Sequence, residues 1–304
     1  MEIRQLEYFL AVVTEMNFSR AAQRVHVVQS ALSASVAKLE KELGVELFDR
    51  SRQKIRITPA GELFSRHARQ VIQSARLAKD SMGEYRGELS GVVELGSLVS
   101  SGQLDLPQIL GEFHRTYPLV RIRLRQRQSQ IGMAAYLESI AAGTPDLALV
   151  SAPDSFPARV TMRLLCEEPL LFVCRHDHRL AQRDHVTVTA LAEEDLIGWP
   201  AEFGLRRLVE DAFAAHGITP RIPYELAADF TFAAGLVRAG LGSVFMPRSE
   251  TRNFPDLRAI PLRSAPTWSI YLAHASQTRI GPSAAKLAEL IMASVDSTTP
   301  PGPS

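Results

Sequence analysis

A single apolar stripe at helical spacing lies between residues 29 and 43 and constrains the fold of the N-terminal part most strongly. Leu32, Val36, Leu39 and Leu43 follow one another at intervals of four, three and four residues, which places them on one face of a helix. The opposite face carries small and basic side chains, namely Ser30, Ser33, Ala34, Ala37, Lys38 and Lys41. This outer face is narrow enough to lie against a close partner, and it is positive towards one end.

Two shorter helices are predicted before this one. The first has an apolar face that includes Leu6 and Phe9, and it is expected to end near Asn17. The second is expected to begin with Ser19 as its N-cap and to turn Ala21 inwards, where a small side chain lets another helix cross closely. Two helices, a short turn and a close crossing make a helix-turn-helix pattern.

A basic hairpin is predicted directly after the helices, over residues 47–61. The residues are expected to form two short strands, with the turn "RSRQK" between them, and so to make a winged helix. Arg50, Arg52, Lys54 and Arg56 lie within seven residues, on a face that is free to meet phosphate groups. The alternative is a solvated hairpin whose charge is incidental.

Residues 58–85 predict one long helix, with Thr58 as N-cap and Pro59 at the first helical position. Its apolar residues repeat at intervals of four and three, which is a heptad seam; they are Phe64, Ala68, Val71, Ala75, Ala78, Met82 and Tyr85. A helix of about 28 residues extends roughly 42 Å, too far to be buried in one small domain. We interpret it as a dimerisation helix and linker; the alternative is a helix that lies on its own C-terminal domain.

Charge and cysteine content bound the class of protein. The formal net charge of the 304 residues is only +1, yet residues 50–79 hold eight basic side chains against Glu62 alone, so a polyanion could bind there. No signal peptide or membrane span is recognisable, and we expect a cytoplasmic protein. Cys166 and Cys174 suit a reducing compartment, as buried thiols or, alternatively, as a redox pair.

Beyond residue 88 strands and helices alternate. Strands are predicted over 92–100, 120–127 and 146–151, with helices between them, which indicates an open α/β sheet. A late strand over 268–275 precedes a final helix over 284–295, so the chain can return to its first lobe. In the strand 120–127 every second residue is arginine, which favours a sheet edge or a subunit interface; the alternative is a solvated face.

Candidate ligand-binding residues follow the strand ends, where open α/β sheets place their crevices. Hydroxyl and amide groups follow the first two strands, and an apolar wall with one arginine precedes a later helix. These candidates are Ser100, Ser101, Ser129, Gln130, Trp199, Pro200, Phe203 and Arg206. The alternative is that the serines cap helices and that Arg206 is solvated.

The motifs of the N-terminal part resemble those of the LysR-type transcriptional regulators. The double alanine, "Q-S-A-L-S", "L-E-x-x-L-G-x-x-L-F-x-R" and "T-P-A-G" all stand at that family's spacing, and "HDHRLA" and "VRAGLGSVFMP" are similar to its later signatures. The resemblance implies a winged helix-turn-helix at 1–58, a linker or dimerisation helix at 59–88 and an effector-binding domain at 89–304. That domain would be similar to type 2 periplasmic binding proteins, with lobe 1 at about 91–161 and 267–296 and lobe 2 at about 162–266. The composition of the last residues, "STTPPGPS", separately predicts a disordered tail at 297–304.

The resemblance also implies which residues meet DNA. Gln29, Ser30 and Ser33 are expected to reach base edges, with glutamine suited to adenine. Phosphate contacts are expected from Lys38, Arg50, Arg52 and Thr58. Ser19 and Ala34 complete the predicted interface; Ala34 stands where the family often has a longer polar reader, so its base contact is left open.

We therefore expect a regulator that binds a partly palindromic DNA site as a dimer or tetramer and responds to a small-molecule effector, a carboxylate being one candidate. RNA polymerase is a partner implied by the resemblance. No catalytic residue, cofactor or metal is expected, since His176 and His178 lack a ligand cluster and Ser100 and Ser101 lack an identifiable base. The alternative is a soluble small-molecule-binding protein or enzyme whose N-terminal helices serve only oligomerisation.

Overall fold

The computed structural model of the chain describes residues 1–50, 55–85, 88–98, 100–126, 132–151, 156–201, 203–227, 229–276 and 280–296. The chain forms two compact units, one over Met1–Gly87 with Ala142–Thr144 and the other over Glu88–Ala141 and Pro145–Ser304. Within the described residues, no helix has the length and apolar character needed to cross a membrane.

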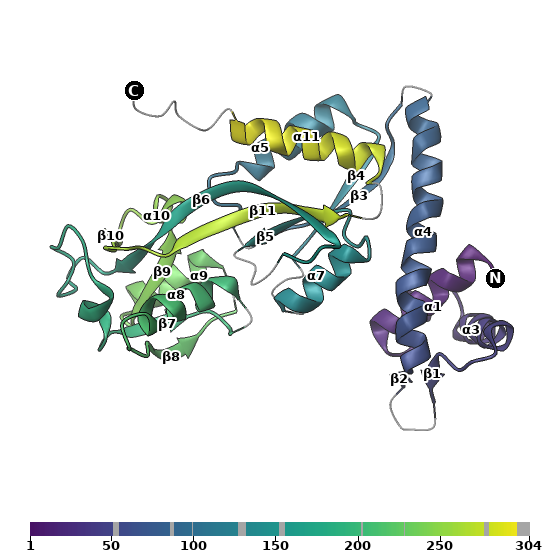
Figure 1. Cartoon of the computed structure of the whole chain (residues 1–304), viewed down its shortest axis with the longest axis horizontal. Helices are drawn as coiled ribbons and strands as arrows, with labels where there is room; N and C mark the ends of the chain where they lie inside the picture. The colour runs from purple at the N-terminus through teal and green to yellow at the C-terminus, as the bar shows by residue number, and fades with distance from the viewer. Residues whose placement is uncertain are drawn as a thin grey trace. The chain divides into compact units, whose positions relative to one another are not determined.

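The first unit is a helix-turn-helix followed by a two-stranded hairpin and a long helix (Figure 1). Its elements are α1 (Ile3–Glu15), α2 (Phe18–Arg24), α3 (Gln29–Leu43), β1 (Phe48–Asp49), β2 (Arg56–Ile57) and α4 (Pro59–Tyr85). The strands pair antiparallel, with Phe48 opposite Ile57. The predicted winged helix-turn-helix is confirmed; the tip of its wing, residues 51–54 with Arg52, lies outside the described residues.

The prediction of Ser19 as the cap of the second helix is wrong. Asn17 has extended backbone and its side chain accepts a hydrogen bond from the backbone N–H of Arg20 at 3.0 Å, so α2 begins at Phe18. Ser19 lies in the first turn of α2 and is exposed. Asparagine and serine are about equally good caps, and the turn that ends α1 brings Asn17 to the capping position first.

The core of the first unit forms around the predicted stripe of α3. Leu32, Val36 and Leu39 are fully buried, whereas Leu43 is 36% exposed because α3 ends directly after it. Gly44 takes up the left-handed conformation, with φ of +70°, that terminates the helix. The ring of Phe9 on α1 lies 5.4 Å from that of Phe48 in the wing, so the same core holds helices and hairpin together.

The long helix α4 has 27 residues and begins as predicted. The Thr58 hydroxyl accepts a hydrogen bond from the Gly61 N–H at 3.0 Å and donates one to the Glu46 carbonyl at 2.8 Å. The heptad seam divides into two parts. Phe64 and Ala68 pack in the core of the first unit, while Val71, Met82 and Tyr85 are 42%, 59% and 88% exposed.

The second unit is a mixed sheet that forms two lobes (Figure 1). The first lobe contains β3 (Gly91–Gly96), α5 (Leu106–Thr116), β4 (Val120–Arg125), α7 (Met133–Ala141), β5 (Leu147–Ser151) and α11 (Pro282–Asp296). The second contains η1 (Val188–Leu191), β7 (Asp195–Gly198), α8 (Gly204–Ala214), β8 (Arg221–Glu225), α9 (Phe230–Arg238), β9 (Ser243–Pro247), α10 (Arg248–Thr251) and β10 (Arg258–Pro261). The predicted two-lobed α/β fold is confirmed.

Two long antiparallel strands join the lobes, β6 (Val160–Cys174) and β11 (Thr267–Ala275). The sheet runs in the order β4-β3-β5-β11-β6-β9-β7-β8, so both crossing strands lie at its centre and β11 returns the chain to the first lobe, as expected. In Figure 1, α5 and α11 cover one side of the first lobe and α7 the other. The arginine-rich strand β4 lies at the edge of this sheet, which confirms one of the two places predicted for it.

Candidate DNA interface and ligand pocket

The outward face of α3 is the candidate DNA interface. Gln29, Ser30, Ala34 and Lys38 are exposed on it, and Ser33 is half-buried at its side. Among the described residues, no carboxylate pairs with Lys38. Because the N-terminal residues of a recognition helix contact base edges while its lysines meet phosphates, this arrangement has the side chains that reading a major groove requires.

Val28, which directly precedes α3, is a further residue of this face that the sequence analysis does not identify. Val28 is the N-cap of the helix, has no capping side-chain oxygen, and is 68% exposed. A serine or threonine is preferred at this position, because its hydroxyl accepts a hydrogen bond from an otherwise unpaired N–H group. The signal was present in the sequence, since valine directly precedes "QSALS".

Two residues predicted to hold phosphates have partners within the protein. Arg50 pairs with Glu40 at 2.7 Å, and its guanidinium lies 5.0 Å from the centre of the Phe18 ring. The hydroxyl of Thr58 is occupied at the start of α4 by the two hydrogen bonds described above. Both side chains therefore hold the wing in place, and Lys38 is the better candidate for a phosphate contact.

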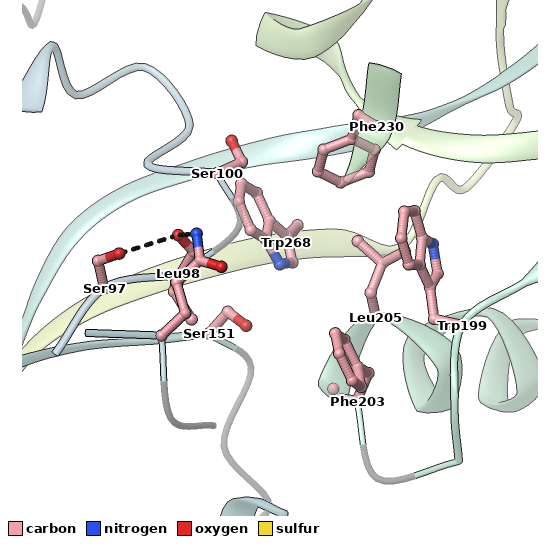
Figure 2. Close-up of a pocket in the computed structure, with 11 residues that line it drawn as sticks. Ser97, Leu98, Ser100, Ser151, Trp199, Phe203, Leu205, Phe230 and Trp268 are labelled. Carbon is pink, nitrogen blue, oxygen red and sulfur yellow. Dashed lines mark hydrogen bonds between the residues drawn. The ribbon is translucent and has the colours of Figure 1, made fainter. Parts of the chain in front are cut away.

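A pocket of about 510 Å³, counting the open space at its mouth, lies between the two lobes (Figure 2). The first lobe contributes hydroxyl and amide groups that follow the carboxyl ends of three parallel strands, β3, β4 and β5. The second contributes apolar groups around the N-termini of α8 and α9, and β11 contributes one indole. The lining residues are Ser97, Leu98, Ser100, Gln126, Ser151, Trp199, Phe203, Gly204, Leu205, Phe230 and Trp268.

Ser100, Trp199 and Phe203 are the predicted ligand residues that line this pocket. Ser101 and Pro200 do not line the pocket. The Ser101 hydroxyl instead donates a hydrogen bond to the Leu104 carbonyl at 2.7 Å. Ser129 and Gln130 lie outside the described residues.

Arg206 also lies away from the pocket. Its guanidinium hydrogen-bonds to Glu210 at 2.6 Å and to the Trp199 carbonyl at 3.0 Å, and Glu225 is 3.7 Å from it. The arginine predicted to pair a carboxylate thus has its own carboxylate partners on the second lobe, because the fourth residue along α8 from it is a glutamate.

Sequence reasoning missed most of the lining, although some signals were available. Gln126 and Ser151 stand at the ends of strands that were predicted, so the rule that placed Ser100 near a crevice applied to them as well. Phe230 follows Asp229, which caps α9 through the N–H of Phe232 at 2.8 Å. Trp268 carried no local signal, because only the sheet order brings β11 to the pocket.

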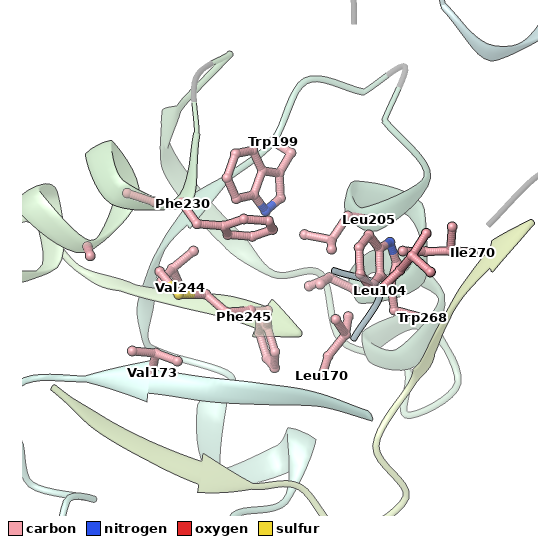
Figure 3. Close-up of a cluster of buried hydrophobic side chains, with 14 of the residues drawn as sticks. Leu104, Leu170, Val173, Trp199, Leu205, Phe230, Val244, Phe245, Trp268 and Ile270 are labelled. Atoms are coloured by element: carbon pink, nitrogen blue, oxygen red, sulfur yellow. The ribbon is translucent and has the colours of Figure 1, made fainter. Parts of the chain in front are cut away.

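The two tryptophans of the pocket are almost fully buried, with 4% of Trp199 and 3% of Trp268 exposed. Within the described part of the chain, neither indole N–H has a hydrogen-bond partner. Trp199 meets the Phe230 ring edge-on, with the ring centres 4.9 Å apart (Figure 3). Each indole is thus a buried donor without a partner among these residues.

Cys166 and Cys174 are free thiols on the same strand, β6. Eight residues of extended strand separate them by about 26 Å, which is far beyond the reach of a disulfide. Burial raises the pKa of both thiols, and that of Cys174 reaches about 11. The alternative of a redox pair formed by these two cysteines is thus incompatible with the structure.

Comparison with known proteins agrees with this architecture. Residues 3–62 match the family described as "Bacterial regulatory helix-turn-helix protein, lysR family", and residues 86–296 match "LysR substrate binding domain". The HTH-type transcriptional regulator ShiR of Corynebacterium glutamicum is 35% identical over 247 residues, which are 80% of this chain and 81% of that protein.

Two full-length solved structures share the fold. A full-length OxyR variant from Pseudomonas aeruginosa gives a TM-score of 0.72 at 22% identity, over 97% of this chain and 94% of that one. Full-length CbnR, solved in complex with its target DNA, gives a TM-score of 0.65 at 25% identity, over 97% and 100%. The chain belongs to the LysR family of DNA-binding transcriptional regulators, with an N-terminal helix-turn-helix domain and a C-terminal effector-binding domain.

Proposed function

We propose that this regulator binds a partly palindromic DNA site as a dimer, or as a tetramer made of dimers, and that a small molecule in the pocket between the lobes changes how it occupies that site. The pocket carries the second half of this proposal, because both lobes and a strand that joins them contribute to its lining. A ligand held there contacts groups whose relative position the lobes determine.

DNA is read by the front of α3 in this proposal. Gln29, Ser30 and Ser33 contact base edges, and Lys38 and Arg52 contact phosphates. Ser19 and Ala34 lie against the DNA without a long side chain to read it. Specificity then depends also on the shape of the DNA and on the spacing of two half-sites, about one helical turn or a multiple of it apart.

Dimerisation occurs through the exposed part of the α4 seam. Val71, Met82 and Tyr85 are solvent-exposed in the single chain, and the small side chains of Ala75 and Ala78 between them let a second helix approach closely. A second copy of α4 buries these residues and fixes the distance between two recognition helices. A double substitution, Met82→Glu with Tyr85→Glu, should therefore shift the sedimentation of the protein to a smaller species, while Val45→Glu in the first unit should not.

The ligand response requires unequal binding to two arrangements of the protein. A molecule that binds both arrangements equally shifts nothing, so the pocket must close differently in each. The strands β6 and β11 are suited to transmit such a change, because each is continuous from one lobe to the other. We propose binding without chemistry, with RNA polymerase as the partner that reads the altered complex.

A footprinting experiment tests the proposal. Full-length protein is screened by thermal shift against defined organic acids, sugars, amino acids and aromatic compounds, and each compound that raises Tm is added to the complex with DNA selected from a random pool. The compound should change the footprint of the wild type but not that of Ser100→Ala, whose binding to DNA alone should be unchanged. Compounds that bind the pocket and leave every footprint unaltered would contradict the proposal.

A further inference from the structure

The pocket has the chemistry to recognise a planar ring that carries an oxygen acceptor. We infer that the effector is a small aromatic compound whose ring lies among the side chains of the second lobe and whose carboxylate or carbonyl oxygen accepts a hydrogen bond from the indole N–H of Trp268. This inference rests on the proposed function, since it names the class of effector for the same pocket.

Four aromatic side chains make the first part of the argument. Trp199, Phe203, Phe230 and Trp268 all line the pocket, and the rings of Trp199 and Phe203 are nearly parallel, with an interplanar angle of 19° and centres 6.4 Å apart. Aromatic rings bind best in offset or edge-to-face contact with other rings. Figure 2 shows the rings of the second lobe on one side of the pocket and three serines on the other, so one end is apolar and the other is polar.

The unpaired N–H of Trp268 makes the second part. Buried donors almost always have a partner, and an exception needs an explanation. Trp199 packs edge-on against Phe230 and nearly parallel to Phe203, whereas Trp268 has no ring contact of this kind among the described residues, and its nitrogen has no hydrogen-bond acceptor there. In Figure 2 the Trp268 nitrogen lies on the ring edge towards Ser151 and Leu205. An acceptor on the ligand satisfies this donor.

The position of Trp268 is fixed by its neighbours. It lies opposite Glu168 in the register of β11 and β6, and the Glu168 carboxylate is held by the N–H and the hydroxyl of Ser249 at 2.6 and 2.8 Å. Gly102 closes on the far edge of the indole, because a Cβ there would lie 3.2 Å from Cζ3 of Trp268. The indole is thus packed before any ligand arrives, and its donor is preorganised.

Further donors surround the same space. The N-terminus of α8 enters the pocket with Gly204 and Leu205, and no side chain caps it within the described residues. The Ser100 hydroxyl oxygen accepts from the Gly102 N–H at 3.0 Å, so its own proton is available to an acceptor. These groups favour an oxygen acceptor over a cationic group, whether that acceptor is ionised or neutral.

The chain offers a direct readout, because Trp199 and Trp268 are its only tryptophans and both line the pocket. Full-length protein is titrated with five probes while tryptophan fluorescence and Tm are recorded. Phenylacetate and phenylacetamide combine a ring with an ionised or neutral acceptor. Cyclohexylacetate has a saturated ring, acetate has no ring, and phenethylamine replaces the acceptor with a cation.

We expect quenching and a raised Tm with phenylacetate or phenylacetamide, and the stronger of the two identifies the acceptor as ionised or neutral. Cyclohexylacetate should bind about three- to tenfold more weakly, since it lacks the aromatic contacts. Acetate and phenethylamine should have no effect at the same concentrations. Trp268→Phe should weaken the acceptor ligands about tenfold, whereas Trp199→Phe should preserve the preference for phenylacetamide over phenethylamine.

Equal binding of phenylacetamide and phenethylamine, binding of acetate as tight as that of phenylacetate, or no binding of either ring acceptor would overturn the inference. These outcomes need only wild-type protein, so a variant that fails to fold does not affect them. A non-aromatic compound that quenches the tryptophans and alters the footprint would overturn the aromatic class and leave the proposed function intact. A ring compound that binds the pocket without altering the footprint would contradict the proposed function and leave the aromatic class intact.

Discussion

The carboxylate of Glu40 on α3 binds the guanidinium of Arg50 at the base of the wing, with 2.7 Å between the nearest atoms. The other oxygen of the same carboxylate accepts the backbone N–H groups of Leu47 and Phe48 at 2.9 and 3.2 Å. One side chain therefore fixes the recognition helix to the wing. Because both amides belong to buried residues, the two hydrogen bonds matter more than the exposed ion pair.

Two substitutions of Glu40 separate the contribution of its backbone hydrogen bonds from that of its ion pair. Glu40→Ala leaves two buried amides without an acceptor and should lower the free energy of unfolding by more than about 2 kcal/mol. Glu40→Gln keeps the acceptor, loses only the ion pair, and should cost about 1 kcal/mol or less. Urea unfolding of the full chain, with hydrogen exchange at the amides of residues 47 and 48, distinguishes the two. Equal losses would show that the ion pair dominates.

The ion pair with Glu40 also distinguishes Arg50 from Lys38, which we propose to contact a phosphate. Lys38→Ala should reduce the salt dependence of DNA binding by about one unit in the slope of log K against log salt, because it removes a phosphate contact. Arg50→Ala should leave that slope unchanged, since Arg50 already pairs with Glu40. Fluorescence anisotropy at several salt concentrations measures both slopes. A flattened slope for Arg50→Ala alone would mean that Arg50 contacts a phosphate in the complex.

Gly61 is required by the close approach of α4 to the wing. A Cβ at this position would lie 2.3 Å from the Leu47 carbonyl oxygen and 2.7 Å from Cγ1 of Ile57. Gly61→Ala should therefore destabilise the first unit by about 2 kcal/mol or more, as overpacking does. Gly235→Ala is the matched control, because nothing lies within 4 Å of that site in α9 and a helical alanine should stabilise by up to about 1 kcal/mol. Similar effects of the two substitutions on Tm would refute the close contact.

The N-cap of α3, Val28, has no side-chain oxygen, so a substitution at this position is expected to stabilise the protein. Val28→Thr places a hydroxyl at an N-cap with extended backbone, φ of −73° and ψ of 143°, and should stabilise the protein by about 1 kcal/mol. Val28→Ala adds no oxygen and is the control. Thermal unfolding of the three proteins measures the difference. If the threonine variant is no more stable than the alanine variant, the N–H groups at the start of α3 already have another partner.

The alkaline stability of the protein should depend on Cys174. Burial, followed by the charge of Glu194, raises the pKa of this thiol to about 11, while the unfolded chain titrates near the ordinary value of 9.0. The contribution to stability is complete below pH 9.0 and is lost as the pH rises towards 11. Cys174→Ala should therefore show a shallower fall in the free energy of unfolding between pH 9 and 11 than the wild type. Parallel curves would contradict the raised pKa.

The sequence predicted those features whose signals are local. The stripe of Leu32, Val36 and Leu39, the cap at Thr58 and the edge position of the arginine-rich strand each follow from spacing or from the chemistry of one residue. The sequence does not distinguish Ser19 from Asn17 as the cap of α2, because both residue types cap helices equally well and the preceding turn decides between them. The ranges of the lobes and of the linker stay predictions.

The pocket was less predictable because distant segments form it. Ser100 and Trp199 could be chosen because each stands beside a predicted strand or helix. Trp268 could not, since its place depends on β11 pairing with both β5 and β6 in the centre of the sheet. The charge of Arg206 indicates a carboxylate site, but Glu210 one helical turn away on α8 neutralises it. Local sequence shows that a side chain is available, and only the tertiary fold shows where it points.

Selection of DNA from a random pool by the full-length protein tests the central claim most directly. We predict enrichment of a partly palindromic motif, with half-sites about one helical turn or a multiple of it apart, and a different motif or a loss of enrichment for Gln29→Ala with Ser33→Ala. Recovery of unrelated sequences, or the same motif for the wild type and this double variant, would contradict the assignment of α3 as the reading helix.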